Sequence, residues 1–202
     1  MKKRNNINQA IHLQMEGVNT LKGLFPDSEA VFNKASEIMM LKAGRCICDV
    51  PINTFYVRVP DEYKYRCKRC RIVVSPLSIT PLNRQHNSLT ITIDLVFRFF
   101  YSKQRLPFSE IARLYKCSRD SARDKSRRAI DWMELSLRHS NNPAIHKHIN
   151  DNKVIRAFSA QHDSLTTAVD SLFHALPSLR LAMKNNSLIN NQNNKSHANC
   201  QS

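Results

Sequence analysis

Two pairs of cysteines have the most distinctive spacing in this chain. Two residues separate Cys67 from Cys70, and thiolates at this spacing on a tight turn can both bind one tetrahedral ion at about 2.3 Å. Eighteen residues separate Cys48 from Cys67, which suits two metal-binding turns joined by a β-hairpin. The sequence therefore predicts a zinc site whose ligands are Cys46, Cys48, Cys67 and Cys70.

The spacing of the first pair leaves alternatives to this zinc site open. One residue between Cys46 and Cys48 places the two thiols on opposite sides of an extended chain, so both can bind one ion only if the backbone bends. No glycine follows Cys48 to ease such a bend. Two other possibilities remain. Three of the thiols could bind zinc with a further ligand such as His86, or Cys46 and Cys48 could be ordinary semi-buried thiols in a β-core that holds without metal. Cys117 and Cys200 are not expected to be ligands.

A second group of residues could bind DNA. Apolar and small residues in 108–123 are spaced to pack two helices around the turn Lys116-Cys117-Ser118, which is the layout of a helix-turn-helix. Basic groups at the start of the second helix can reach base edges or phosphates. The predicted DNA-binding residues here are Ser118, Arg119, Ser121, Arg123, Lys125 and Arg127. A solvated basic helix in a three-helix bundle is the alternative.

The charge of the chain favours a polyanionic partner. Its 202 residues include 31 Lys and Arg against 16 Asp and Glu, a formal charge of +15. Residues 42–128 contain 19 of these basic residues against 7 acidic ones, so most of the charge lies there. Double-stranded DNA is the predicted partner. The basic residues of the hairpin that are expected to contact its backbone are Lys64, Arg66, Lys68, Arg69 and Arg71.

Several function classes are disfavoured by composition. No apolar run approaches the roughly 18 to 20 residues of a membrane span, and the basic start lacks the apolar core of a secretory signal. Three glycines in the whole chain leave no glycine-rich loop for a nucleotide phosphate. Asp151, Asp163 and Asp170 lie in helical or linker sequence and are not expected to bind a catalytic metal. We expect a cytoplasmic protein that is not an enzyme and has no membrane partner.

The elements that must position these residues suggest an α+β fold that is mostly α. It comprises a zinc-ribbon-like β-hairpin unit, then a three-helix helix-turn-helix domain and a C-terminal helix. The expected segments are a helical lead-in at 1–44, the zinc-ribbon-like unit at 45–81, the helix-turn-helix domain at 82–138, the C-terminal helical segment at 139–184 and a disordered, asparagine-rich tail at 185–202.

Periodicity and turn residues also place the individual elements. A helix before residue 42 is expected to be capped by Asp27 or Ser28. Strands are expected at 54–59, 63–66 and 71–74, and helices at 88–103, 107–115, 119–137 and 154–183, the last interrupted by Pro177. The apolar stripe from Val154 to Leu176 needs a cover, which is either the same chain or a second copy in a homodimer.

Three phrases resemble a known family. They are Leu-Phe-Pro-Asp-Ser-Glu-Ala at 24–30, Tyr-Arg-Cys-Lys-Arg-Cys-Arg at 65–71 and Leu-Pro-Phe-Ser-Glu-Ile-Ala at 106–112. In this order they resemble the N-terminal DNA-binding region of insertion-sequence transposases that carry a zinc ribbon before their catalytic domain. The resemblance covers about 21–133 and implies a zinc ribbon, a helix-turn-helix and DNA binding.

The chain departs from that family at two places. Its first cysteine turn is Cys46-Ile47-Cys48-Asp49, where the family has two residues between the cysteines and a glycine after them. Only 69 residues follow Met133, too few for the ribonuclease-H-like catalytic domain of those transposases. We therefore expect a sequence-specific DNA-binding protein that regulates transcription or a mobile element. A truncated or degenerate transposase without activity, a protein-interaction module and an RNA-binding module are the alternatives.

Overall fold

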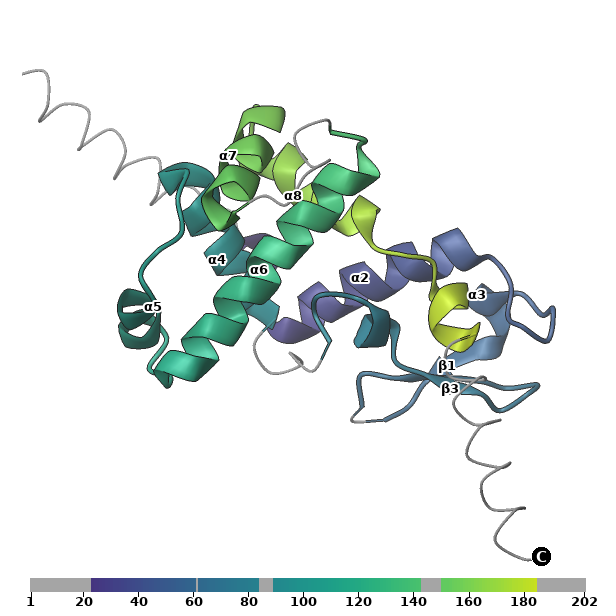
Figure 1. The fold of residues 1–202 in the computed structure, drawn as a ribbon. Helices are drawn as coiled ribbons and strands as arrows, with labels where there is room; N and C mark the ends of the chain where they lie inside the picture. The colour runs from purple at the N-terminus through teal and green to yellow at the C-terminus, as the bar shows by residue number, and fades with distance from the viewer. Residues whose placement is uncertain (1–22, 61, 84–88, 143–149, 185–202) are drawn as a thin grey trace, which may run out of the picture. The chain divides into compact units, whose positions relative to one another are not determined.

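The protein is mostly helical and has one small antiparallel sheet (Figure 1). The computed structural model describes residues 23–60, 62–83, 89–142 and 150–184. The chain forms two compact units, the first comprising residues up to 31 together with 85–175, and the second comprising 32–84 together with residues from 176 onward. The prediction of an α+β fold that is mostly α is confirmed. The predictions for His86, for Cys200, for the lead-in before residue 23 and for the tail lie outside the described residues.

Helix α2 (Ser28–Ala43) provides most of the helical structure of the second unit. The side chain of Asp27 accepts a hydrogen bond from the backbone N–H of Ala30 at 2.8 Å, which confirms Asp27 as the helix cap. The helix ends at Gly44, whose φ of 62° places it in the left-handed region and whose N–H donates to the carbonyl of Met40. Gly44 thereby turns the chain toward the first cysteine pair.

The sheet of the second unit is a meander in the order β1-β2-β3. Its strands are β1 (Tyr56–Arg58), β2 (Tyr65–Cys67) and β3 (Val73–Val74), preceded by the helical turn α3 (Ile52–Phe55) and followed by the 3₁₀ turn η1 (Pro76–Ile79). The predicted strand at 54–59 is therefore wrong at residues 54, 55 and 59, and the strands predicted at 63–66 and 71–74 each begin two residues too early. Pro51 precedes this turn and accepts a hydrogen bond from the N–H of Phe55, which closes one helical turn before the strand begins.

The first unit is a helical bundle around α6 (Arg119–His139). Helix α6 packs against every other helix in this bundle, namely α4 (Leu89–Ser102), α5 (Phe108–Leu114), α7 (Asp151–Gln161) and α8 (Leu165–Ala175). Trp132 is fully buried, donates its indole N–H to the carbonyl of Leu172 at 2.9 Å and meets the ring of Phe173 edge-on. The three helices predicted for the helix-turn-helix region are confirmed to within a few residues.

The long C-terminal helix predicted at 154–183 is instead divided into shorter helices. Helix α7 ends at Gln161, and α8 begins after Ser164, whose hydroxyl accepts a hydrogen bond from the N–H of Thr167. Helix α8 ends before Pro177, as predicted. Residues 179–184 form a further turn of helix, which belongs to the second unit. The apolar stripe of α7 and α8 is buried within the first unit, so the chain itself covers the surface that suggested a homodimer.

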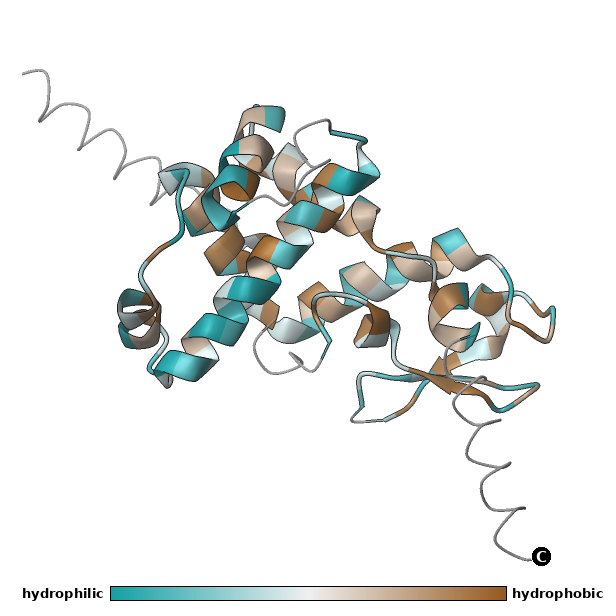
Figure 2. Ribbon diagram, viewed as in Figure 1, coloured by the Kyte–Doolittle hydropathy of each residue, from teal (hydrophilic) through white to brown (hydrophobic). Residues whose placement is uncertain are grey.

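Hydropathy differs along the bundle (Figure 2). Hydrophobic residues dominate α4, whereas hydrophilic residues dominate the N-terminal half of α6.

In the described part of the chain, no helix has both the length and the hydropathy needed to cross a bilayer.

Candidate metal centre and basic helix

The four predicted cysteine ligands come together in the second unit. Their sulfur atoms all lie within 4.8 Å of one another, with 3.7 Å from Cys46 to Cys70 and 3.8 Å from Cys48 to Cys67. A tetrahedron with metal–sulfur bonds of about 2.3 Å has edges of about 3.8 Å. The four cysteines that the sequence grouped therefore lie together in a cluster that could hold one metal ion.

The two cysteine turns share one hydrogen-bond pattern despite their different lengths. In the second turn, the N–H of Cys67 donates to the carbonyl of Ile72 and its carbonyl accepts from the N–H of Arg71. In the first turn, the N–H of Cys46 donates to the carbonyl of Val50 and its carbonyl accepts from the N–H of Asp49. The first turn is one residue shorter, yet each bond has its counterpart, so the shorter spacing still forms a closed turn.

A bend after Cys48 brings the first pair of thiols to one side. Asp49 has a φ of 65° and Arg71 has a φ of 64°, so the residue after the second cysteine is left-handed in both turns. Aspartate tolerates this conformation better than most residues with a Cβ. The guanidinium of Arg45 also donates to the carbonyl of Asp49 at 2.7 Å and forms an ion pair with its carboxylate. The first cysteine turn therefore bends at Asp49 without a glycine.

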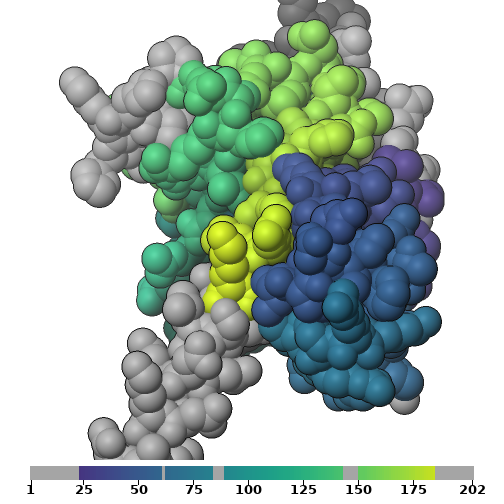
Figure 3. Space-filling view, turned by 90° about the vertical axis from the view of Figure 1, so that its right-hand side faces the viewer, coloured from purple at the N-terminus to yellow at the C-terminus, as the bar shows by residue number. Residues whose placement is uncertain are grey.

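Tyr56 connects the cysteine cluster to the C-terminal part of the second unit. Its hydroxyl lies 3.3 Å from the sulfur of Cys46 and 3.3 Å from the sulfur of Met183, to which it donates. Burial and the neighbouring thiols raise the pKa of Tyr56, so it stays a neutral hydrogen-bond donor. In Figure 3, residues 176–184 (yellow) lie against α2 and the residues that follow it (blue). Sequence reasoning missed Tyr56 because its partner Met183 is 127 residues away.

The environments of the four thiols differ. Cys46 and Cys67 are buried, Cys48 is half-buried and Cys70 is exposed. Burial raises the pKa of Cys46 and raises that of Cys70 to about 12, where the neighbouring sulfurs add to the effect. Burial also acts to raise the pKa of Cys67, but hydrogen bonds from the N–H groups of Cys70 and Arg69 outweigh it and lower the value to about 7. These N–H groups are thus placed to stabilise a thiolate at Cys67.

The predicted DNA-contacting residues of the hairpin are all on the surface. Lys64 forms an ion pair with Glu62 at 2.5 Å, and Arg69 donates to the carbonyl of Cys48 at 3.5 Å. Arg66 lies on the exposed side of β2, between Val57 and Val73 on the neighbouring strands. The residues that remain exposed are Lys64, Arg66, Lys68, Arg69 and Arg71. Their positions leave them accessible to a polyanion.

A short helix and a tight turn precede the basic residues of α6. Helix α5 has seven residues and is joined to α6 by a four-residue turn, in which Lys116 is left-handed with a φ of 49°. The hydroxyl of Ser118 accepts a hydrogen bond from the N–H of Ser121 at 3.1 Å, which confirms Ser118 as the cap of α6. Arg119 and Asp120, the first two residues of α6, are exposed.

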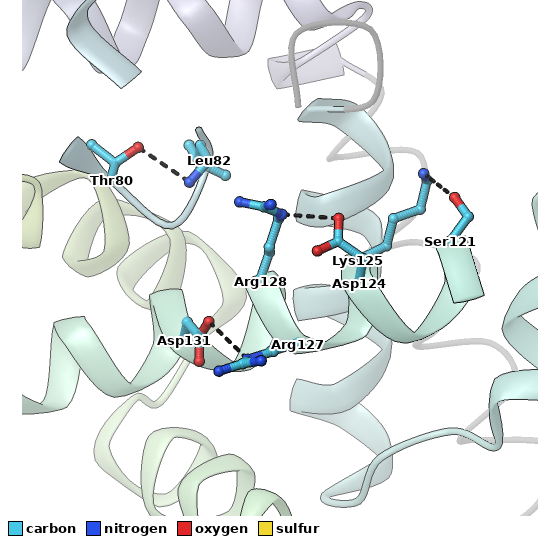
Figure 4. A network of polar contacts seen from close by, with 8 residues as sticks. All are labelled: Thr80, Leu82, Ser121, Asp124, Lys125, Arg127, Arg128 and Asp131. Atoms are coloured by element: carbon cyan, nitrogen blue, oxygen red, sulfur yellow. Dashed lines mark hydrogen bonds and ion pairs between the residues drawn. The ribbon is translucent and has the colours of Figure 1, made fainter. Parts of the chain in front are cut away.

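The basic residues predicted on α6 divide between two flanks. Arg119, Arg123 and Arg127 are exposed at intervals of four residues and therefore share one flank, which we call the arginine ladder. Lys125 instead donates to the hydroxyl of Ser121 at 2.8 Å on another flank (Figure 4). Lys125 and Ser121 thus lie together and away from the ladder.

Two arginines of α6 lie near carboxylates one helical turn away. Arg128 forms an ion pair with Asp124 at 3.0 Å, and Arg127 lies 3.9 Å from Asp131 (Figure 4). The long distance between Arg127 and Asp131 leaves the Arg127 guanidinium able to take another partner.

A turn of the second unit is also drawn in Figure 4. There the hydroxyl of Thr80 accepts a hydrogen bond from the N–H of Leu82.

Comparison with protein-family models, with curated proteins and with solved structures finds no match to this chain.

Proposed function

We propose that this protein is a zinc-containing, sequence-specific double-stranded DNA-binding protein that regulates transcription or a mobile element. The observation that carries the proposal is the arginine ladder on the exposed N-terminal half of a capped helix, supported by a short helix across a four-residue turn. This is the arrangement in which a helix-turn-helix presents side chains to the major groove.

The metal we propose is zinc in a structural role. Four sulfur ligands at tetrahedral spacing match closed Cys₄ zinc sites, and soft thiolates select against magnesium and calcium. A site with four protein ligands leaves no open position for a reacting water. The proposed zinc therefore stabilises the two cysteine turns and the hairpin between them, and it supplies no chemistry of its own.

The DNA contact we propose begins with the arginine ladder. A helix about 10 to 12 Å across with its side chains fits a major groove about 12 Å wide, and the arginine ladder extends over about 12 Å of the length of α6. Arginine can donate two parallel hydrogen bonds to a guanine edge or to a phosphate. The exposed basic residues of the hairpin add sequence-independent contacts to the DNA backbone, so binding should weaken steeply as salt rises.

The first experiment is selection of the full chain against sheared genomic DNA at about 150 mM salt, where non-specific binding is largely suppressed. Recovery of one repeated sequence supports the proposal, and inverted repeats beside genes identify an operator or a mobile-element end. Uniform recovery, or none, contradicts sequence-specific recognition. A parallel selection with RNA tests the competing class of nucleic acid.

Single substitutions then assign the contacts. Arg123→Ala should lower affinity for the selected site about 10-fold to 100-fold and relax its sequence preference, because a bidentate contact to one base is lost. Lys68→Ala should weaken binding to every sequence alike and reduce the salt dependence. Arg156→Ala is the matched control, since it removes the same charge from an exposed position on α7. Equal losses for Arg123→Ala and Arg156→Ala would mean that only net charge matters.

A further inference from the structure

A pocket of about 470 Å³ lies in the first unit beside the N-terminal half of α6. Its walls come from α6, from the residues around the start of α5 and from the first residue of α7. Three arginines line it, namely Arg105, Arg123 and Arg127, and only the last two belong to the predicted DNA-binding set. Arg105 joins them through tertiary structure, so its role could not be predicted from sequence spacing.

The three guanidinium groups of the pocket differ in how closely they pair with carboxylates. Arg105 donates to the carboxylate of Asp151 at 2.7 Å, a close ion pair. Arg127 lies 3.9 Å from Asp131, at the limit of an ion pair, and its side chain is 80% exposed. Arg123 lies over the ring of Phe108 at 5.6 Å and has no carboxylate partner among the described residues. Two of the three cations can therefore accept a new anionic partner.

The ring of Phe108 holds two of these guanidinium groups in place. Arg105 lies over it at 4.4 Å, and Arg123 lies over it at 5.6 Å. Such cation–π contacts orient the planar fork of an arginine without neutralising its charge. Three arginines and two carboxylates, those of Asp131 and Asp151, line the pocket, so the charged side chains of its lining sum to +1. The pocket is thus preorganised for an anion of modest size.

A buried hydroxyl in the pocket lining lacks a partner. Ser126 has no exposed surface, and within the described residues its Oγ has no hydrogen-bond partner. An unpaired buried hydroxyl costs stability, because it loses its hydrogen bonds to water and gains none in return. Alanine would fit the same position on the helix at no such cost. A change of the Ser126 rotamer toward the pocket that it lines would expose the hydroxyl to a ligand oxygen, and donation to that oxygen would account for the serine.

We propose that this pocket binds a phosphate group, held by Arg123 and Arg127 and by a hydrogen bond from the Ser126 hydroxyl. Arginine forks and a hydroxyl donor match the oxygen atoms of a phosphate better than a carboxylate, which offers only two acceptor oxygens. The source that the position beside α6 favours is the DNA backbone, and in that respect the inference rests on the proposed function. A small phosphorylated ligand has the same chemistry.

The test measures binding of inorganic phosphate to the full chain by NMR and calorimetry, with chloride replacing phosphate at constant ionic strength in the control titration. Wild-type protein should show saturable shifts at the backbone amides of α6. Arg123→Ala should weaken this binding at least 10-fold. Ser126→Ala should weaken it several-fold while raising the melting temperature of the phosphate-free protein, a combination that a purely structural serine cannot produce.

Ser36→Ala is the matched control for the serine. Ser36 is the other fully buried serine whose Oγ lacks a partner in the described residues, but it lies on α2 and does not line the pocket. Its replacement should raise the melting temperature and leave phosphate binding unchanged. If Ser126→Ala and Ser36→Ala behave alike in both measurements, or if phosphate and chloride titrations are indistinguishable, the proposal is overturned.

A competition arm separates the two sources and separates this inference from the proposed function. Competition between phosphate and a DNA duplex, together with weaker DNA binding by Ser126→Ala, supports a backbone phosphate in the pocket. Saturable phosphate binding by a chain that does not bind DNA supports the pocket with a small phosphorylated ligand, although the proposed function then fails. DNA binding that neither phosphate nor Ser126→Ala affects, in a chain without saturable phosphate binding, overturns the pocket alone.

Discussion

The cysteine cluster and the arginine-bearing helix are stabilised in different ways. The strands β1, β2 and β3 are only two or three residues long, and Val57 and Val73 remain exposed on the sheet. Helix α6 instead has 21 residues and buries one face, including Trp132, against four other helices. Very short strands cannot repay their ordering entropy alone, whereas a packed helix bundle can. We therefore expect the proposed zinc to stabilise the cysteine region and not the helix bundle.

Removing one ligand should give the largest effect and tests this contrast directly. Structural zinc supplies about 10 to 16 kcal/mol of apparent binding free energy in small zinc domains, so Cys67→Ser should lower metal affinity by several orders of magnitude. Metal content measured by mass spectrometry should fall from one zinc per chain, and amide exchange should accelerate throughout 45–75. Cys117→Ser, in the turn before α6, should change neither quantity.

Trp132 shows whether the helix bundle is affected at the same time. It is the only tryptophan in the chain and lies in the first unit, so its fluorescence reports on that unit alone. Its emission should stay the same in Cys67→Ser and after treatment with a chelator. If the emission shifts to longer wavelength together with zinc loss, the bundle also depends on the metal and the contrast is wrong.

Helices α4, α5 and α6 could be predicted from sequence because their signals are local. Apolar periodicity marks α4 and α6, and Ser118 with the N–H of Ser121 forms a cap that involves neighbouring residues only. The four cysteines were also predictable as one group, since their spacing alone indicates two turns. The break between α7 and α8 was missed, although Ser164 before an apolar run is a local cap signal.

Tertiary contacts account for the parts of the site that sequence could not predict. The contact of Tyr56 with Met183 joins residues 127 positions apart. The pocket beside α6 likewise combines Arg105 with Asp151, which are 46 residues apart. Side chains that meet across such distances leave no periodic pattern in the sequence.

The second largest effect should come from the core of the helix bundle. Trp132→Ala removes a fully buried indole and its hydrogen bond to Leu172, so the free energy of unfolding should fall by about 3 to 5 kcal/mol. Thermal unfolding followed by circular dichroism measures the loss. Zinc content should remain one per chain, because no cysteine ligand lies in that unit. Loss of zinc in this variant would show that the two regions fold as one cooperative unit.

An intermediate effect should come from the contact beside the metal ligands. Tyr56→Phe keeps the ring but removes the hydroxyl that lies between Cys46 and Met183. Groups that hydrogen-bond to metal ligands typically contribute 10-fold to 100-fold in affinity, so zinc affinity should fall by about 10-fold. Competition with a chromogenic chelator measures the change. Tyr63→Phe, on a ring that packs against Phe32 instead, should leave zinc affinity unchanged.

The smallest effect should come from the cap of α6, where stability and DNA contact can be separated. Ser118→Ala removes the hydrogen bond to the N–H of Ser121 and should lower the free energy of unfolding by about 1 kcal/mol. Ser118→Asp should retain the cap, because a carboxylate also accepts this hydrogen bond and interacts favourably with the helix dipole. Thermal unfolding of both variants measures these changes.

Binding of DNA should follow the opposite order in the same two variants. Ser118→Ala leaves the charge of the helix start unchanged and removes only one predicted hydroxyl contact to phosphate, so its DNA affinity should fall little when it is measured well below the melting temperature. Ser118→Asp is stable but places a negative charge beside the arginine ladder, where it repels phosphate. Its affinity should fall several-fold, most at low salt. If the aspartate variant binds as tightly as the alanine variant at every salt concentration, the N-terminal end of α6 does not face DNA.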